Sequence, residues 1–269
     1  MPIDYSSYKY IEVEVEDGVA TVTLNRPEAL NAPDEEGSYE LHYRIFPDLG
    51  QDERIRAIIL TGAGRAFCAG GDQKRGSADW AREREKEALY ARQSRLILID
   101  SILNVDKPII AAVNGPAIGM GATIALFCDI IIAADTARFG DTHIRVGLVP
   151  GDGGIVIWPL LVGLAKAKEL LMTGDIIDAK EAERIGLVNR VVPLEDLMST
   201  AKALARRLAQ GPTLAIGWTK RSINKKVKQD LNLLMDDGDA TQRLCYFTED
   251  YKEGIKAFQE KREARFKGR

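Results

Sequence analysis

The stretch PIIAAVNGPAIGMGATIALFCDIIIAAD, residues 108–135, decides the class of fold. It is the longest apolar tract in the chain, yet Asn114, Pro116, three glycines and Asp129 interrupt it. A membrane-spanning helix needs about 20 consecutive apolar residues, and these interruptions leave no such run. The pattern instead predicts a buried strand, a turn, a helix and a second buried strand.

Short apolar strands of this kind recur along the chain. AIILTGAG (57–64), PIIAAVNG (108–115) and IIIAAD (130–135) are continuously apolar, which is typical of strands buried on both faces of a parallel sheet. Helical spacing with polar outer faces separates them, so helices are expected to cross between the strands. An alternating hairpin that turns at Asp17-Gly18 precedes them. The sequence therefore predicts a layered α/β fold.

The pattern changes after about Glu181, where a helix, a turn and a strand are followed by successive helices. We therefore expect an α/β core over residues 1–200 and a helical region over residues 201–269. The last segment, YKEGIKAFQEKREARFKGR, is amphipathic and strongly charged. It is expected either to pack on a partner subunit or to remain a solvated tail.

Composition excludes several classes of function. The net charge of −3 over 269 residues gives no argument for a nucleic-acid partner. The three cysteines are widely spaced and lack a nearby histidine, so we expect no metal site and a reducing, cytoplasmic environment. The charged N-terminus is unlike a signal peptide, and no membrane partner is expected.

Two glycine-rich turns are the candidate chemical elements. GAGRAFCAGGDQKRG (62–76) and NGPAIGMGATIAL (114–126) each lead from a strand toward a helix, so free backbone N–H groups and a positive helix end face the same way. Two such turns aimed at one point would make an oxyanion hole for an enolate; tight packing is the alternative reading. Neither turn matches a phosphate loop or a dinucleotide fingerprint, so ATP and NAD are not expected.

Seven motifs, taken in order, resemble the crotonase (enoyl-CoA hydratase/isomerase) superfamily over almost the whole chain. The resemblance implies a spiral of ββα repeats with a helical C-terminal trimerisation region, assembled as a homotrimer or a dimer of trimers. It also implies an acyl-CoA substrate and no separate cofactor. The motifs are LNRPEALNA, RAFCAGGD, PIIAAVNGPAIGMG, CDIIIAAD, ARFGDTHIRVGLVPGDGG, AKELLMTGDIIDAKEAERIGLVNRVVP and GIKAFQEKR.

The resemblance also assigns site residues. By motif position, the oxyanion donors would be the N–H groups of Ala69 and Met120. Lys261 would lie near the nucleotide phosphates, or be an ordinary charge on a solvated helix. Tyr246 would face the acyl group of an adjoining subunit, or be a half-buried aromatic. The CoA-binding positions would lie around Arg26 to Leu30, including Ala29 and Leu30, and at Gly70, Gly71 and Asp72.

The chain departs from the superfamily where hydratases carry two glutamates. Those positions hold Thr123 and His143. A threonine hydroxyl can orient water or simply pack in a helix, but it is not a general base at neutral pH. Imidazole both accepts and donates a proton near neutral pH, so His143 is the main catalytic candidate. Asp152, nine residues further on, would be its partner or a helix N-cap.

Three functions follow from this pattern. The leading one is an enoyl-CoA hydratase/isomerase-like lyase that stabilises an enolate oxyanion. The second is a hydrolase that cleaves a C–C bond of a cyclic β-keto or β-diketone acyl-CoA with His143 and Asp152. The third is an acyl-CoA binding protein without catalysis. A likeness to naphthoate-synthase-type enzymes, through Tyr246 and Thr142, is weakened by Pro150, where those enzymes carry an aspartate.

Overall fold

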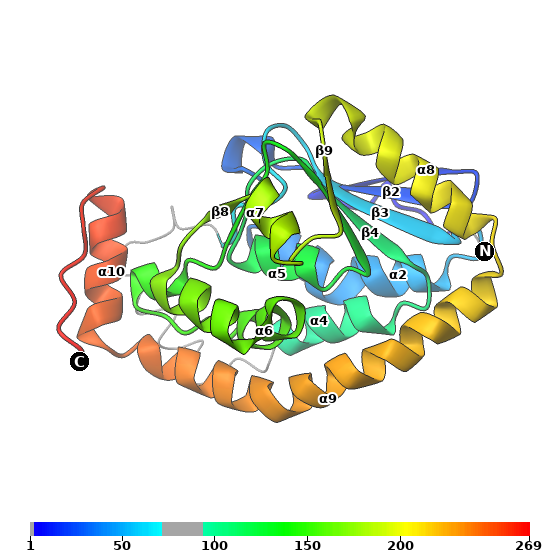
Figure 1. Ribbon diagram of the computed structural model, residues 1–269. Coiled ribbons are helices and arrows are strands. Elements are labelled where there is room, and N and C mark those ends of the chain that lie inside the picture. The colour runs from blue at the N-terminus through cyan, green and yellow to red at the C-terminus, as the bar shows by residue number, and fades with distance from the viewer. Residues whose placement is uncertain (1–2, 72–93) are drawn as a thin grey trace.

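A six-stranded sheet forms the centre of the molecule in the computed structural model, which describes residues 3–71 and 94–269 (Figure 1). The strand order is β1-β2-β3-β4-β6-β9. Only the first pair, β1 with β2, is antiparallel; the other pairs are parallel. The strands span Ile11–Glu16, Val19–Leu24, Ala57–Gly62, Ile109–Val113, Ile130–Ala134 and Arg190–Val192.

A second, smaller sheet is built from β5, which follows β4, from β7, which follows β6, and from β8, which follows α6. β5 (Ala117–Ile118) pairs parallel with β7 (Arg138–Gly140), which pairs antiparallel with β8 (Ile177–Asp178). Cys68 forms a parallel bridge with Ala117 and so joins this sheet to the turn after β3. The strand–strand–helix succession confirms the predicted layered α/β fold.

Helices cover both faces of the large sheet, as Figure 1 shows. One face packs on α8, and the other packs on α2, α4 and α5. The helices are α1 (Glu35–Tyr39), a π-helix (Glu40–Arg44), α2 (Ile45–Gln51), α4 (Ser94–Asn104), α5 (Met120–Leu126), α6 (Gly154–Thr173), α7 (Ala179–Arg184), α8 (Leu197–Ala209), α9 (Thr213–Cys245) and α10 (Glu249–Gln259). Short 3-10 turns span Pro27–Ala29, His143–Val146 (η4) and Leu194–Asp196.

Alternate residues of the central strands enter two different cores. Ile58 and Leu60 lie in the cluster on the α2/α4 side, whereas Ile59 packs with Ala201 and Ala205 of α8. Successive side chains of a strand point to opposite faces, so a strand covered on both sides is apolar at every position. This confirms the prediction drawn from the continuous apolar runs.

The C-terminal region is helical, as predicted. Figure 1 shows α9 running along one side of the molecule past α4 and α6, with α10 at its end. The buried Lys220 ammonium of α9 lies 2.7 Å from the Asp129 carboxylate and 3.0 Å from the Lys107 carbonyl oxygen. Helix α8 crosses residue 200 and packs on the sheet, so the proposed boundary at 200 cuts through a helix of the core.

No helix within residues 3–71 and 94–269 combines the length and the apolar character that a membrane crossing requires.

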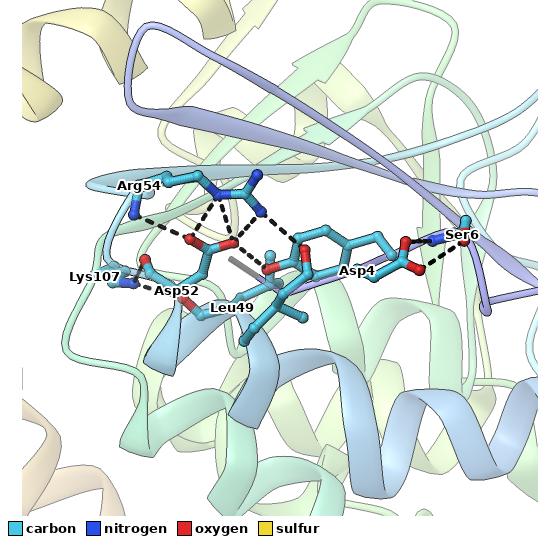
Figure 2. A network of polar contacts seen from close by, with 8 residues as sticks. Asp4, Ser6, Leu49, Asp52, Arg54 and Lys107 are labelled. Carbon is cyan, nitrogen blue, oxygen red and sulfur yellow. Dashed lines mark hydrogen bonds and ion pairs between the residues drawn. The ribbon is translucent and has the colours of Figure 1, made fainter. Parts of the chain in front are cut away.

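A buried carboxylate fixes the N-terminal segment (Figure 2). Asp52 at the end of α2 accepts hydrogen bonds from Arg54 Nη2 (2.6 Å) and Nε and from the Tyr5 hydroxyl (3.1 Å). Arg54 also donates to the Ile3 carbonyl oxygen at 2.9 Å, and Lys107 donates to the carbonyl oxygens of Leu49 and Asp52. The network joins the start of the chain, the end of α2 and the loop before β4.

The Asp52 network predicts a pH-dependent stability. Hydrogen bonds from the Arg54 guanidinium lower the pKa of Asp52 from 3.8 to about 2. A carboxyl with a lowered pKa in the folded state stabilises the protein above its unfolded pKa and loses that contribution as pH falls toward its folded pKa. We expect Arg54→Met to lower the free energy of unfolding by about 1 to 2 kcal/mol near neutral pH, and the difference from wild type to shrink between pH 4 and 2.

Urea unfolding at a series of pH values measures this difference. Arg56→Met, at an exposed arginine two residues away, makes the same change in net charge and is the matched control. An Arg54→Met difference that stays constant from pH 6 to pH 2 would contradict the assigned role of Asp52.

Candidate active site

Two backbone turns meet at the edge shared by the two sheets. Phe67 and Cys68 both donate their N–H groups to the Pro116 carbonyl oxygen, and Ile118 N–H donates to the Cys68 carbonyl oxygen at 3.0 Å. The turns can approach this closely because they carry glycines: a Cβ on Gly115 would lie 2.2 Å from the Arg65 carbonyl oxygen, and one on Gly121 would lie 2.0 Å from that of Cys68. Any larger residue would separate the two turns.

Asn31 holds the first turn in shape. Its fully buried side-chain amide donates to the carbonyl oxygens of Ala63 (2.9 Å), Ala66 (2.8 Å) and Phe67 (3.2 Å), and its Oδ1 accepts from Arg26 N–H. The predicted CoA-binding positions Ala29 and Leu30 are half-buried in the loop just before it. The loop of residues 26–31 therefore lies directly against residues 63–69.

The amide groups of the first turn differ from the prediction. The Ala69 N–H, predicted as an oxyanion donor, donates to the Leu30 carbonyl oxygen at 2.9 Å and so is not available to a ligand in this structure. The Gly70 N–H faces the Cys68 sulfur. Burial raises the pKa of the Cys68 thiol to about 12, although this contact opposes the rise, so Cys68 remains a neutral core thiol.

The second turn brings Met120 to the same place. Gly70 has φ +90°, and a Cβ there would lie 2.8 Å from the Ile118 carbonyl oxygen and 3.7 Å from the Met120 nitrogen. Met120 is the first residue of α5, at the positive end of the helix. Gly71 is exposed and follows directly, and the predicted CoA-binding Asp72 lies outside the described residues.

His143 lies beside this second turn, at the start of η4. The position of a Cβ built on Gly119 is 3.6 Å from His143 Cε1, so the imidazole contacts the residue before Met120. Its Nδ1 lies 2.6 Å from Asp141 Oδ1, and its Nε2 lies 3.4 Å from Asp152 Oδ2. The side chain of His143 is 18% exposed, whereas those of Asp141 and Asp152 are 1% and 5% exposed.

Asp152 faces the site and does not cap a helix. Helix α6 begins at Gly154 with Gly153 as its N-cap and no side-chain capping bond, so the N-cap reading of Asp152 is wrong. Instead its Oδ1 accepts from the Thr123 hydroxyl at 3.3 Å. A Cβ on Gly151 would lie 2.2 Å from the Gly238 carbonyl oxygen of α9, so only glycine allows this turn to pack on α9. The structure thus joins Thr123, His143 and Asp152.

Asp141 completes the cluster and was not predicted. Sequence reasoning compared His143 with residues further along the chain and passed over the aspartate two positions before it. The spacing was an available signal, because an aspartate in a turn often accepts from the backbone N–H two residues on. Asp141 Oδ1 does so with the His143 N–H at 3.3 Å, besides contacting the ring.

The three groups form a chain of close contacts, at 2.6 Å between Asp141 and His143 and at 3.4 Å between His143 and Asp152. Atoms of Asp141, His143 and Asp152 lie within 4.8 Å of one another, as in a metal site. However, the two carboxylates contact different ring nitrogens, which point away from each other, so one ion cannot bind all three groups at ligand distances of about 2 Å. We therefore interpret the cluster as carboxylate, imidazole and carboxylate in series.

Helix α10 supports the turn that carries His143. A Cβ on Gly147 would lie 3.0 Å from the Asp250 backbone, and one on Gly254 would lie 2.7 Å from the backbone of Val146. Tyr246 is buried with Leu148 in the same region, with its ring edge-on to Tyr251 at 5.1 Å. Tyr246 thus packs within its own chain, and its contact with an acyl group stays a prediction.

The other predicted positions differ in their burial. Lys261 is exposed beyond the end of α10, with φ +53°. Thr142 is half-buried immediately before η4, and Pro150 is buried before the turn that carries Asp152.

The fold and the paired turns define a crotonase-type α/β protein, and comparisons with known proteins identify its family. The Enoyl-CoA hydratase/isomerase profile matches residues 14–269, and the chain belongs to this family. The chain is 39% identical over 264 residues to the 1,2-epoxyphenylacetyl-CoA isomerase of Escherichia coli (strain K12), covering 97% of this chain and 99% of the relative. It is 38% identical over 254 residues to the short-chain-enoyl-CoA hydratase of Clostridium acetobutylicum, covering 93% and 94%.

Solved structures of enoyl-CoA hydratases superpose closely on this fold. A crystal structure of an enoyl-CoA hydratase from Mycobacterium avium subsp. paratuberculosis K-10 superposes with a TM-score of 0.85 at 27% identity, covering 96% of this chain and 99% of that one. An enoyl-CoA hydratase/isomerase from Mycobacterium paratuberculosis gives 0.84 at 34% identity, covering 94% and 99%.

The contact between α10 and η4 is tested by Gly254→Ala. Alanine is favoured over glycine in a helix by about 1 kcal/mol, but its Cβ would meet the Val146 backbone at 2.7 Å. The overlap outweighs the helix preference, because backbone atoms cannot move aside singly. We expect a loss of about 1 to 3 kcal/mol in the free energy of unfolding and a displaced His143 ring.

Denaturant unfolding and the NMR signals of the His143 ring measure these effects. Gly50→Ala in α2 is the matched control, because its Cβ would lie 3.9 Å from the nearest atom, in Val105, and should stabilise the helix slightly. Equal stabilisation by both substitutions would show that α10 does not constrain η4.

Proposed function

We propose that the protein acts on an acyl-CoA thioester by stabilising an enolate oxygen, with His143 as the acid/base group. The observation that carries the proposal is the position of the His143 imidazole, next to Gly119 and Met120 at the start of α5. An imidazole beside a set of backbone donors can move a proton at carbon or water while the donors hold the developing negative charge.

The oxyanion donors proposed here are the N–H groups of Met120 and Gly71. Ala69 N–H is bonded to Leu30 and Gly70 N–H faces the Cys68 sulfur, so Gly71 carries the next donor along this turn. Each preorganised donor of this kind contributes about 3 kcal/mol to transition-state stabilisation. CoA would enter as part of the substrate, with no separate cofactor.

Hydration is the first candidate reaction, because two acid/base groups are present despite the missing glutamates. Water must lose a proton as its oxygen bonds to the β-carbon, and the α-carbon of the enolate must gain one. His143 stands at one glutamate position, and the Asp152 carboxylate contacts Thr123 at the other. Asp152 thus supplies a carboxylate next to Thr123, at the position where hydratases carry a glutamate.

Hydrolytic C–C cleavage is the second candidate, favoured by the 3.4 Å contact between His143 Nε2 and Asp152 Oδ2. In this reaction His143 removes a proton from water, and the oxygen adds to the ring ketone of a cyclic β-ketoacyl-CoA. The bond between that carbon and the α-carbon then breaks, leaving a carboxyl group and a thioester enolate. The enolate takes the proton at the α-carbon.

A homotrimer or dimer of trimers, a cytoplasmic location, and acyl-group contacts from Tyr246 and phosphate contacts from Lys261 remain predictions of the family resemblance.

Incubation with straight-chain enoyl-CoAs and cyclic β-ketoacyl-CoAs, followed by mass spectrometry, tests the function. Both reactions add the mass of one water, but hydration yields a hydroxyacyl-CoA and ring cleavage yields a dicarboxylic acyl-CoA. Unchanged substrate across both series, with binding retained, would indicate an acyl-CoA binding protein and overturn the proposal.

Substitutions at the site then assign the roles. We expect His143→Gln and Asp152→Asn each to lower kcat by roughly 100-fold or more while the chain stays folded, because each removes a proton-transfer group. Thr123→Val removes only a hydroxyl and should lower kcat by less than about 10-fold. Steady-state kinetics and circular dichroism measure both effects, and an Asp152→Asn variant with full activity would assign the chemistry to His143 alone.

A further inference from the structure

The imidazole of His143 is held from one side by a carboxylate that the proposed reaction does not use. Asp141 Oδ1 lies 2.6 Å from the ring Nδ1 and accepts from the His143 backbone N–H at 3.3 Å. We propose that Asp141 is a positioning residue that keeps the neutral His143 ring protonated on Nδ1, so that Nε2 is the atom that exchanges protons. The inference rests on the acid/base role proposed for His143.

The contact at Nδ1 determines which tautomer is stable. An ionised carboxylate only accepts hydrogen bonds, so a separation of 2.6 Å requires a proton on Nδ1. The same oxygen also accepts the backbone N–H, which fixes the ring relative to its own main chain. The imidazole is thereby prevented from turning over, and its Nε2 edge stays on the side of Asp152.

The contact at Nε2 is much weaker. Nε2 and Asp152 Oδ2 are 3.4 Å apart, longer than the usual 2.7 to 3.2 Å of an N–H···O bond. Among the described residues, Asp141 on its own loop and Asp152 from the turn before α6 face the ring, and of these two carboxylates Asp141 is the one at full hydrogen-bond distance. Under the proposal, Nε2 is the ring atom that exchanges a proton with water or substrate.

Burying the Asp141 carboxylate costs free energy, which a group with only a structural role gives no reason to spend. The residue is 2% exposed, and its Oδ2 is buried without a hydrogen-bond partner within the described part of the chain. A Cβ on Gly154 would lie 2.3 Å from this oxygen, so only glycine at the start of α6 leaves room for the carboxylate. The N-terminus of α6, whose first segment runs from Gly154 to a break in the helix at Gly163, supplies a partial positive charge there.

The tautomer can be read directly, because the chain has only two histidines. Two-bond ¹H–¹⁵N correlation spectra of the full-length ¹⁵N-labelled protein distinguish a proton on Nδ1 from one on Nε2. His143→Gln identifies the signals by their loss, and the remaining set belongs to His42. For the neutral ring we expect Nδ1–H in the wild type. Nε2–H, or a ring that keeps both protons up to pH 9, overturns the proposal.

Two substitutions of Asp141 then separate positioning from structure. Asp141→Ala removes the acceptor, so the proton should move to Nε2, opposite Asp152, and kcat should fall by roughly 100-fold or more with KM changed by less than about 3-fold. Asp141→Asn keeps a carbonyl oxygen that can accept from Nδ1–H, and it should restore the Nδ1–H form and part of the activity. An Asp141→Ala protein that keeps both the Nδ1–H form and kcat overturns the proposal.

Asp52→Asn is the matched control, since it neutralises another buried, hydrogen-bonded aspartate on a different element. It should leave the His143 spectrum and kcat unchanged. The two proposals fail separately: full activity of His143→Gln would refute the acid/base role, whereas the tautomer of the wild-type ring tests Asp141 whether or not a substrate has been found. If neither Asp141 variant folds, the wild-type spectrum alone still decides the outcome.

Discussion

The close approach of two backbone turns, residues 63–70 and 115–121, is the constraint on which the rest of this structure depends. Glycines at 115 and 121 remove the side chains that would otherwise strike the carbonyl groups of Arg65 and Cys68. Asn31 satisfies three carbonyl oxygens of the first turn, which would be costly if buried without partners. The turns follow β3 and β4, which are paired in the parallel sheet, so the sheet itself sets their separation.

The candidate acid/base groups are brought to these turns by other parts of the chain. Asp141 directly follows β7, His143 begins η4, and the turn before α6 carries Asp152. Glycines again allow the contacts, at 147 and 254 between η4 and α10 and at 151 against α9. The ion pair between Lys220 and Asp129 ties helix α9 to the core. Burial raises the pKa of Asp129 by more than the nearby Lys220 ammonium lowers it. The C-terminal helices therefore determine where His143 lies.

The groups available for proton transfer at this candidate site differ from the two glutamates of hydratases. A hydration needs one group that takes a proton and one that gives it, and two glutamates are not the only means. Here an imidazole lies between two buried carboxylates, and under the proposed function these groups would take and give the proton. Relatives of similar identity carry the names of an isomerase and of a hydratase, so overall similarity defines the family and leaves the reaction to these local groups.

The sequence by itself determined the fold and predicted where the candidate site lies. Apolar strands at 57–62, 109–113 and 130–134 require burial on both faces, and the motifs place Met120, Thr123 and His143 in order. Hydrophobic periodicity and turn chemistry are local, so they can be read along the chain. Only the tertiary structure decided that the Ala69 amide is bonded to Leu30, that Asp152 faces Thr123, and that Asp141 holds the His143 ring. Whether a polar group is engaged or available depends on atoms that lie far apart in sequence, and no local pattern records those distances.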